Sequence, residues 1–247
     1  MVHNTANSER LEFVVEELHG YLRSDLRHGD HFLPAPFMIE FTGSPDAGKT
    51  TCITELDKFL HRHDFRVLIP QEGAQAIRHI HRKTPEYNIR TGLYALNMLI
   101  DFAHGHSYDV VIFDRSIFDA YAWMMYWEDK KLLSSEERNT IQQFFLSRFW
   151  VDRIIASYFV ICEPDEAVRR GQRIAVSDKL GDSSNHESIR KSVERHKKMH
   201  AELSTEYPQL KLIDTTHMGE AEMIAHVTTT TMETLLAKAR ERRNRSQ

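Results

Sequence analysis

The chain has 247 residues, of which 41% are hydrophobic and 28% charged, with a formal net charge of −4 and a pI near 6.4. These values are ordinary for a globular protein and exclude a global basic field that would attract nucleic acid or an anionic membrane. Its two cysteines, Cys52 and Cys162, lie far apart without metal-ligand spacing, which argues against a disulfide scaffold and favours a cytoplasmic location.

The N-terminal region shows helical periodicity and lacks the apolar segment of a signal peptide. Apolar residues recur at helical spacing through residues 8–28, with Ser8 in the N-cap position, and glycine and proline residues interrupt the pattern between 29 and 36. No run approaches the roughly eighteen apolar residues of a membrane helix. We expect an N-terminal helical extension, residues 1–33, and a main domain, residues 34–247. The extension packs on the main domain or forms a dimer contact, and the sequence leaves both open.

From residue 37 onward, short apolar runs alternate with longer segments of helical periodicity. The apolar runs predict strands at 37–41, 67–69, 110–113, 158–162 and 210–213. Helices are predicted at 49–63, 73–82, 88–106, 117–130, 135–151, 164–175, 187–205 and 219–243. Strands separated by helices need crossover connections, so this order predicts a parallel sheet with helices on both faces. Ligands of such sheets bind at the carboxyl ends of the strands.

The first of these strands leads into a phosphate-binding pattern, G-x-x-x-x-G-K-[ST]. Its residues are Gly43, Ser44, Pro45, Asp46, Ala47, Gly48, Lys49 and Thr50, followed by Thr51. Backbone N–H groups of such a loop cradle phosphates, Lys49 reaches the β- and γ-phosphates, and the Thr50 hydroxyl ligates Mg²⁺. The pattern therefore predicts that residues 43–51 bind ATP with Mg²⁺. Asp46 is unusual because a carboxylate repels phosphate, so we expect it to point outward, with a metal or acceptor contact as the alternative.

A second acidic position follows the buried strand pattern at 110–113. Asp114 ends that run, and in proteins with a phosphate loop a strand-end carboxylate of this kind holds Mg²⁺ directly or through water. Arg115 comes next, and its guanidinium can fork onto phosphate oxygens, or it can form a salt bridge at the strand end.

These two segments together resemble a known enzyme group. Residues 39–51 resemble the opening of thymidylate kinases, and Asp114-Arg115-Ser116 is similar to the Asp-Arg-Tyr of those enzymes and the Glu-Arg-Ser of deoxynucleoside kinases. The resemblance spans roughly residues 37–215 and implies the nucleoside and nucleoside-monophosphate kinase group. It also implies an α/β fold, the P-loop NTPase three-layer sandwich, with a five-stranded parallel sheet, helices on both faces and a helical lid.

The sequence departs from this group in the region that would bind the acceptor. The Arg-Glu-Pro-Gly of thymidylate kinases is present only as Gln71-Glu72-Gly73, and the acidic residue that those kinases carry earlier in the loop is replaced by Pro45. Residues 71–74 are also similar to ribosylnicotinamide-kinase-like proteins. The resemblance therefore implies the phosphate donor and leaves the acceptor open.

Glu72 and one helix supply candidate acceptor residues. The resemblance to deoxynucleoside kinases implies that Glu72 takes the proton of a hydroxyl acceptor, whereas a phosphate acceptor needs no strong base and makes an arginine such as Arg115 more important. An ordinary exposed loop carboxylate is the alternative for Glu72. Arg90, Tyr94 and Asn97 are further candidates, and the last two share a helix face that could stack on a base and bond its edge, or be core and surface residues.

The helix predicted at 164–175 carries three arginines. Arg169 and Arg173 are four residues apart and face one way, with Arg170 beside them. The resemblance implies a lid whose arginines close over the β- and γ-phosphates during transfer, and the Ser-, Asp- and Gly-rich stretch 176–186 fits a closing loop. Solvated arginines on a helix surface are the alternative.

A histidine pair, an aromatic cluster and a run of C-terminal arginines can each be explained by the fold alone. We expect His196 and His200 on a solvated helix face, because no acidic or cysteine partner accompanies them. The aromatic cluster of Tyr121, Trp123, Tyr126 and Trp127 belongs to the core, to a subunit interface or to an acceptor pocket. The arginines between 240 and 245 form a solvated helix end or contact a phosphate-rich partner.

The sequence predicts an ATP-dependent kinase that phosphorylates a small nucleoside or nucleoside monophosphate. Two alternatives stay open: a kinase acting on a nucleic-acid end or another polymer, which the acidic pI does not favour, and a regulatory ATPase. An Asn-Lys-x-Asp motif is absent from the sequence, so a GTPase is not expected. We expect no membrane partner, and a homodimer is compatible with the sequence.

Overall fold

The computed structural model describes residues 2–24, 36–103, 107–174 and 185–246, with side chains for 9–22, 36–103, 107–172 and 185–244. Within these ranges one parallel sheet has the strand order β2-β3-β1-β4-β5. Its strands are β1 (Phe37–Gly43), β2 (Val67–Leu68), β3 (Val110–Asp114), β4 (Ile154–Ile161) and β5 (Leu210–Asp214). The predicted five-stranded parallel sheet is confirmed, with β1 at its centre.

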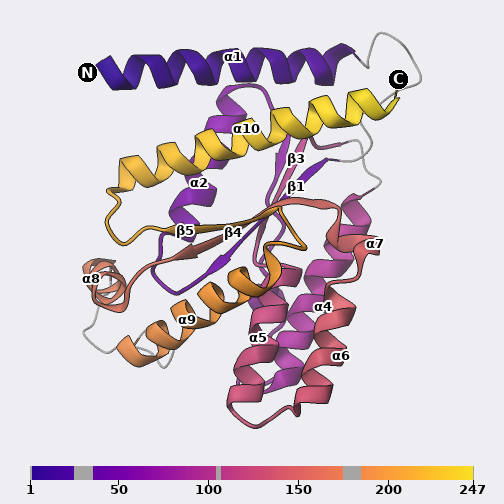
Figure 1. Ribbon diagram of the computed structural model, residues 1–247, viewed down its shortest axis with the longest axis vertical. Coiled ribbons are helices and arrows are strands. Elements are labelled where there is room, and N and C mark those ends of the chain that lie inside the picture. The colour runs from indigo at the N-terminus through magenta and orange to yellow at the C-terminus, as the bar shows by residue number, and fades with distance from the viewer. Residues whose placement is uncertain (1, 25–35, 104–106, 175–184, 247) are drawn as a thin grey trace.

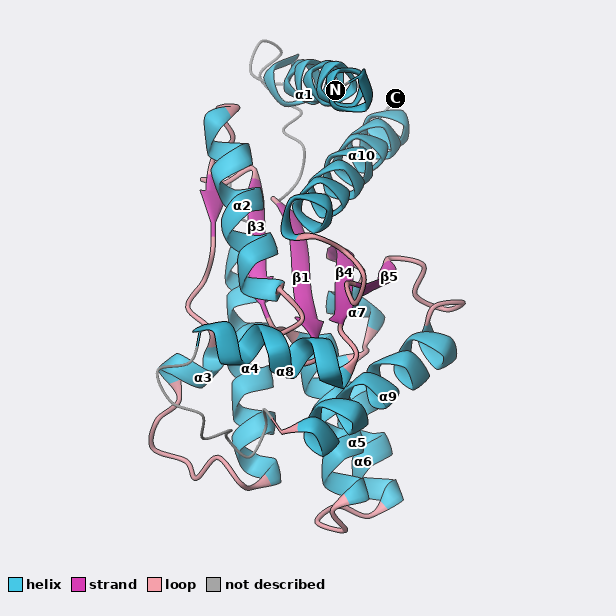
Figure 2. Cartoon of the chain, turned by 90° about the vertical axis from the view of Figure 1, so that its left-hand side faces the viewer, coloured by secondary structure: helices cyan, strands magenta, loops and turns pink. Residues whose placement is uncertain are grey.

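Helices cover both faces of the sheet (Figures 1 and 2). They are α1 (Val2–Ser24), α2 (Lys49–Arg62), α3 (Gly73–Ala76), α4 (Pro85–Phe102), α5 (Ile117–Asp129), α6 (Ser135–Phe145), α7 (Arg148–Val151), α8 (Pro164–Ile174), α9 (His186–Leu203) and α10 (Glu220–Ser246). α2 and α10 pack on one face, with α1 laid across α10, and α5 and α9 pack on the other, with α4 and α6 behind α5. None of the helices in the described ranges combines the length and apolarity that crossing a membrane requires.

Side chains alternate along β1 and enter two separate cores. Phe37, Ile39 and Phe41 join the core beneath α2 and α10, whereas Met38 joins the core beneath α4 and α5. Glu40 and Thr42 occupy the next two positions on the Met38 face and are fully buried. The central strand therefore sends two polar side chains toward α5 at the carboxyl end of the sheet.

Several predicted boundaries were wrong. The helix predicted at 73–82 ends at Ala76 because Ile77 is extended, and Thr84 then caps α4, which begins at Pro85 rather than at 88. The helix predicted at 135–151 breaks at Ser147, whose backbone is extended. β4 begins at 154 rather than 158, and α1 begins before the predicted residue 8. Residues 25–28 of the predicted first helix lie outside the described residues.

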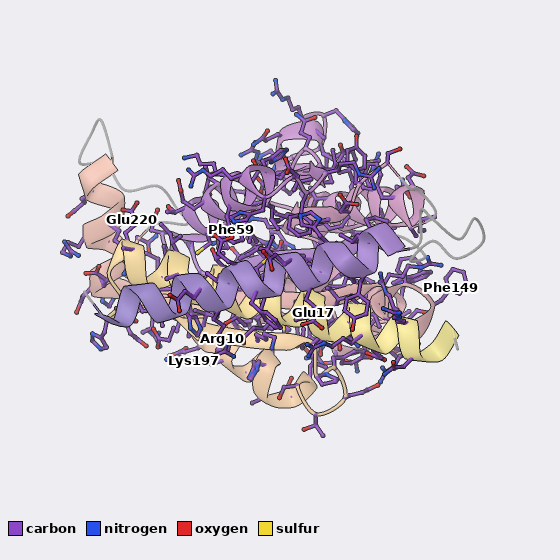
Figure 3. All side chains as sticks on the ribbon, turned by 90° about the horizontal axis from the view of Figure 1, so that it is seen from above. Arg10, Glu17, Phe59, Phe149, Lys197 and Glu220 are labelled. Carbon is purple, nitrogen blue, oxygen red and sulfur yellow. The ribbon has the colours of Figure 1, made fainter. Side chains whose placement is uncertain are left out.

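The first helix shares a core with the main domain. Val14, Val15 and Leu18 are buried in the cluster that includes β1, α2 and α10. Figure 3 shows α1 alongside α10 with Glu17 between them, and the Arg240 guanidinium donates to both Glu17 carboxylate oxygens at 2.6–2.9 Å. Of the two arrangements that the sequence left open, α1 packs on the main domain.

The arginines near the C-terminus contact side chains of other elements. The Arg242 guanidinium lies 4.5 Å from the centre of the Phe37 ring, and that of Arg243 lies 5.4 Å from the centre of the Tyr21 ring. Together with the Arg240 ion pair, these contacts use the cationic groups to cover aromatic surface, because long basic side chains pack their stems on apolar groups. Arg240 and Arg243 are exposed, as the expectation of a solvated end requires, whereas Arg242 is half-buried and departs from it.

Leu18→Ala should lower the free energy of unfolding by about 2–4 kcal/mol, because it leaves a cavity in a fully buried site of the shared core. Urea unfolding measures this change. Phe13→Ala is the matched control on the same helix, since Phe13 is 62% exposed and its removal should change stability by less than about 0.5 kcal/mol. Equal stability of both variants would mean that α1 does not pack as described.

Candidate active site

The phosphate-binding pattern forms a loop between β1 and α2 whose glycines are required by sterics. Gly43 has φ +135°, and a Cβ there would lie 1.8 Å from the Val160 carbonyl oxygen. Gly48, with φ +94°, precedes α2 and supplies no side-chain cap to it. Unpaired N–H groups at the first turn of a helix attract anions. The two glycines thus allow the loop to pack closely against Val160 of β4 and Met223 of α10.

Lys49 is buried at this loop and folded back on it. Its Nζ donates to the carbonyl oxygens of Ser44 at 2.5 Å and Gly43 at 3.3 Å. Burial lowers the pKa of Lys49 to about 8, Arg115 acts in the same direction, and Asp114 opposes both. Thr50 is exposed at the start of α2, and Pro45 and Thr51 are half-buried. The predicted donor-binding residues therefore lie together around one loop.

Residues at the ends of β4 and β5 form hydrogen bonds that support the loop. The Ser44 hydroxyl accepts from the Cys162 N–H at 3.1 Å, and the Ser44 N–H donates to the Val160 carbonyl at 3.0 Å. The Thr215 hydroxyl donates to the Ala47 carbonyl at 2.9 Å. Thr215 follows β5 and was missed by the sequence analysis, because no local pattern connects it to a loop that lies 168 residues earlier.

Asp46 lies against the predicted lid helix. It has φ +53°, an uncommon value for a residue other than glycine, and its side chain is exposed. A Cβ added to Gly171 of α8 would lie 3.0 Å from Asp46 Oδ2. The carboxylate therefore faces α8, and Gly171 provides the room for it.

Asp114 and Arg115 lie beside the loop. Asp114 pairs with Phe41 in the β1–β3 register, and burial raises its pKa while Arg115 and Lys49 oppose that effect. Arg115 has φ +67°, and its N–H donates to the Phe41 carbonyl at 2.9 Å. A non-glycine residue in this region is strained by about 1–3 kcal/mol and persists only where its surroundings impose it.

The guanidinium of Arg115 joins two carboxylates. Its Nε lies 3.1 Å from Glu72 Oε1, and one terminal nitrogen donates to Asp119 Oδ1 at 3.4 Å. Glu72 is 22% exposed, and burial raises its pKa while Arg115 opposes that effect. Glu72 is therefore a half-buried, paired carboxylate rather than an ordinary exposed loop residue.

Asp119 was missed by the sequence analysis. Its Oδ1 accepts from the Thr42 hydroxyl at 2.7 Å, and its Oδ2 accepts from the Trp123 indole N–H at 3.0 Å. With the Arg115 contact, one buried carboxylate thus links the end of β1, the Asp-Arg-Ser turn and the aromatic face of α5. The only sequence signal was an acidic residue in an otherwise apolar helix start.

Glu40 was also missed. It is fully buried, and its Oε1 accepts from the backbone N–H groups of Ser116 at 2.8 Å and Asp119 at 3.0 Å. Its Oε2 accepts from the Ser157 hydroxyl at 3.3 Å and the Phe118 N–H at 3.4 Å. Burial raises the pKa of Glu40 to about 7, although these backbone donors act against it. The signal was a carboxylate inside the apolar run Phe-Met-Ile-Glu-Phe.

The predicted acceptor residues on α4 lie at different distances along the helix axis from the part of α4 that reaches Glu72. Thr91 packs against Gly73, the neighbour of Glu72, and so marks the part of α4 that reaches the site. Arg90 is adjacent and half-buried, and Tyr94 follows one turn later. Asn97 is exposed and six residues beyond Thr91, about 9 Å along the helix axis. Its helix position therefore separates Asn97 from Glu72 and Arg115.

The aromatic cluster on α5 is only in part a core element. Trp127 is buried and donates its indole N–H to Asn88 Oδ1 at 3.0 Å, whereas Trp123 is half-buried and tied to Asp119. Tyr126 lies beneath the Arg195 guanidinium at 5.1 Å. Trp123 is thus the aromatic residue of this cluster that hydrogen bonds connect to the site.

The arginines of α8 have different partners. Arg169 is 58% exposed and donates to both oxygens of Glu166 at 2.6 and 2.7 Å. Arg170 donates to Glu166, to the Thr215 hydroxyl at 3.0 Å and to the Thr215 carbonyl at 2.7 Å. The side chain of Arg173 and most of the stretch 176–186 lie outside the described residues. Arg170 therefore connects α8 to the support of the phosphate loop, and Arg169 faces solvent.

His196 is not on a solvated face, as the sequence had suggested. It is 4% exposed, packs edge-on against Phe159, and burial lowers its pKa to about 4. Its Nδ1 lies 2.8 Å from the Ser192 carbonyl, an ordinary contact within a helix. Among the described side chains, no group of three or more His, Cys, Asp and Glu residues could hold a metal.

Glu40→Gln should stabilise the protein at pH 8 and not at pH 4. Because the folded-state pKa of about 7 lies above the ordinary 4.5, the stabilising contribution of neutral Glu40 is present below about pH 4.5 and is lost as pH rises through 7. The gap corresponds to about 3 kcal/mol in urea unfolding. Glu9→Gln, at an exposed site, should match wild type at both pH values; a pH-independent effect of Glu40→Gln would contradict the assignment.

Comparison with known proteins identifies the fold. No protein-family model matches the sequence, and no curated protein matches it. Among solved structures, the chain is similar to one described as deoxyadenosine kinase from M. mycoides with the products dCMP and a flexible dCDP bound. The TM-score is 0.56 at 14% sequence identity, and the match covers 80% of this chain and 99% of that one. The chain therefore has the P-loop kinase fold, a five-stranded parallel sheet with helices on both faces.

Proposed function

We propose that this protein is an ATP-dependent phosphotransferase that moves the γ-phosphoryl group of ATP to a hydroxyl of a nucleoside or a similar small acceptor. The observation that carries the proposal is the ion pair of Glu72 with Arg115, at 3.1 Å, beside a phosphate loop that contains the buried Lys49. One site thus combines a carboxylate that could act as a base, an arginine paired with it, and a loop that could bind phosphate. The fold shared with a deoxyadenosine kinase supports the same assignment.

The donor side of the site would be formed by residues 43–51. Backbone N–H groups and Lys49 would bind the phosphates of ATP, and the Thr50 hydroxyl with the Asp114 carboxylate would hold Mg²⁺. Hydroxyl and carboxylate oxygens are the hard donors that Mg²⁺ takes, so the residues present fit the ion. When bound, the ion neutralises charge on the β- and γ-phosphates.

The charges around Arg115 favour a hydroxyl over a phosphate acceptor. Glu72 and Asp119 both engage its guanidinium, and Asp114 adds a third carboxylate nearby. A dianionic phosphate would have to displace one of these carboxylates or approach them without a compensating cation. A neutral hydroxyl meets no such repulsion. We therefore favour a nucleoside over a nucleoside monophosphate.

The chemical step follows from these positions. The acceptor oxygen attacks the γ-phosphorus as the bond to the ADP oxygen breaks, and the hydroxyl proton passes to a carboxylate oxygen of Glu72. The Glu72 pKa, raised by burial, suits a group that must accept this proton and later release it. Arg115, held between Glu72 and Asp119, would turn toward the negative charge that develops on the transferred group.

The acceptor itself would lie between α3, α4 and α5. Trp123 presents a half-buried ring whose indole N–H is held by Asp119, so its orientation is set by the same carboxylate that positions Arg115. An aromatic face in a fixed orientation is a suitable platform for a planar base. Tyr94 and Arg90 on α4 are candidates for contacts on the opposite side, and Asn97 is the weakest candidate because of its distance along that helix.

An acceptor screen with Mg-ATP tests the function. ADP release is followed with nucleosides, nucleoside monophosphates and nicotinamide riboside, and stimulation by one hydroxyl class is expected. Lys49→Ala should lower that rate by about 10²–10³ with an unchanged circular dichroism spectrum, and Lys58→Ala, exposed on the same helix, should leave it unchanged. ATP binding with a flat acceptor profile would instead indicate a polymer substrate or a regulatory ATPase.

Glu72→Gln should separate the two acceptor classes. The amide cannot accept a proton, so kcat with a hydroxyl acceptor should fall by about 10²–10⁴, whereas any activity with a phosphate acceptor should persist. Steady-state kinetics with both classes measures the difference. Glu86→Gln, exposed at the start of α4, is the control. Equal losses for both classes would remove Glu72 from the role of base.

A further inference from the structure

The Asp-Arg-Ser turn is held by a residue outside the predicted machinery. Glu40 belongs to β1, 76 residues before Ser116, and its two oxygens accept the N–H groups of Ser116, Phe118 and Asp119. In α5 these are the N-cap residue and the second and third residues of the first turn, whose N–H groups have no partner within a helix. A strand carboxylate thus caps this helix.

The cap is needed because the turn does not cap itself. Ser116 occupies the N-cap position, where serine usually accepts from the first turn, but it makes no such bond here. Its hydroxyl oxygen is buried and has no partner among the described residues. Without Glu40, three N–H groups would be left unpaired in the core, at a cost of about 1–3 kcal/mol each.

The cap also opposes the backbone strain at Arg115. Arg115 precedes the capped residues and has φ +67°, in the left-handed region. The turn is held on one side by the Arg115 N–H bond to the Phe41 carbonyl and on the other by the Ser116 N–H bond to Glu40. Both acceptors belong to adjacent residues of β1. Strand β1 therefore determines the direction in which the Arg115 side chain leaves the turn.

We propose that Glu40 is a positioning residue for phosphoryl transfer: it caps α5 from within the sheet and so holds Arg115 where its guanidinium spans Glu72 and Asp119. The proposal rests on the proposed function for its kinetic consequence. Glu40 touches no reacting atom and acts through the backbone of the turn. Its role requires a hydrogen-bond acceptor at the Oε1 position and does not require a negative charge.

Two substitutions separate acceptor geometry from charge. In Glu40→Gln the amide oxygen can replace Oε1 and keep the bonds from Ser116 and Asp119, while the amide nitrogen can donate to the Ser157 hydroxyl. Only the long Phe118 contact of 3.4 Å is lost. Glu40→Asp keeps the charge but withdraws the carboxylate by one carbon–carbon bond length. We expect kcat within about 3-fold of wild type for Gln and a loss of about 10- to 100-fold for Asp, because small displacements of catalytic groups have effects of this size.

Further variants test whether the effect passes through Arg115. Glu40→Met, which lacks an acceptor, should lower kcat as Asp does, with KM for ATP within about 2-fold of wild type since the phosphate loop is untouched. Combined with Arg115→Ala, it should add little to the loss caused by Arg115→Ala alone. Ser157→Ala is the matched control, because it removes a contact of the same carboxylate but none with α5, and it should leave kcat unchanged.

Hydrogen exchange keeps this test independent of the acceptor. In Glu40→Met and Glu40→Asp, the peptide covering residues 114–121 should exchange faster than in wild type, while Glu40→Gln should retain protection. Faster exchange with no kinase activity in wild type or any variant would mean that the proposed function fails, while Glu40 still caps α5 and orders the turn. If Glu40→Met does not fold, the Gln and Asp pair decides alone.

Three results would overturn the proposal. The first is wild-type kcat in Glu40→Asp, or in a folded Glu40→Met. The second is a loss in Glu40→Gln as large as in Glu40→Asp, which would show that an uncharged acceptor at the Oε1 position is not sufficient. The third is a double variant, Glu40→Met with Arg115→Ala, whose loss of kcat equals the product of the two single losses. Independent effects of this kind would show that Glu40 does not act through Arg115.

Discussion

The alternation of side chains along β1 is the constraint on which the site depends. Because successive residues point to opposite faces, Ile39 and Phe41 enter the core under α2 and α10, and Glu40 and Thr42 both face α5. Glu40 bonds the backbone at the start of α5, and Thr42 bonds the Asp119 side chain one turn later. One residue further, Gly43 must pass Val160 without a Cβ. A one-residue slip of β1 would therefore destroy the cap, the Asp119 contact and the phosphate loop together.

Acidic side chains outnumber basic side chains at the site. Three carboxylates, Glu72, Asp114 and Asp119, surround one arginine, and the charge of Lys49 also acts on them. Burial raises the pKa of Asp114 and Glu72, so their ionised forms depend on Arg115 and Lys49 for stabilisation. A bound cation would relieve this excess of negative charge, whereas an anionic acceptor would increase it. Under the proposed function, the same imbalance would favour metal-bound ATP on one side and an uncharged acceptor on the other.

The residues that could be predicted are those whose signal is local. The loop between β1 and α2, the position of Asp114 at a strand end and the sequence of strands along the chain follow from contiguous patterns, and the sheet is five-stranded and parallel as predicted. Glu40, Asp119 and Thr215 could not be predicted, because their roles depend on partners 76–79 or 168 residues away. The helix predicted at 73–82 ends at Ala76 because Ile77 is extended, and the next helix begins only after the Thr84 cap. His196 was misplaced because periodicity alone did not show which helix face packs on Phe159.

The contacts of α8 distinguish Arg169 from Arg170, the two arginines of this helix whose side chains the structure describes. Arg170 is half-buried and bonds Thr215, whose hydroxyl also holds the Ala47 carbonyl of the phosphate loop, so moving Arg170 would disturb the loop itself. Arg169 bonds only Glu166 among the described residues, in an exposed pair. Exposed pairs of this kind contribute little to stability, and a nucleotide phosphate carries more charge than a single carboxylate. If α8 closes over a nucleotide, Arg170 would act as its fixed point, and Arg169 could exchange Glu166 for phosphate at little cost.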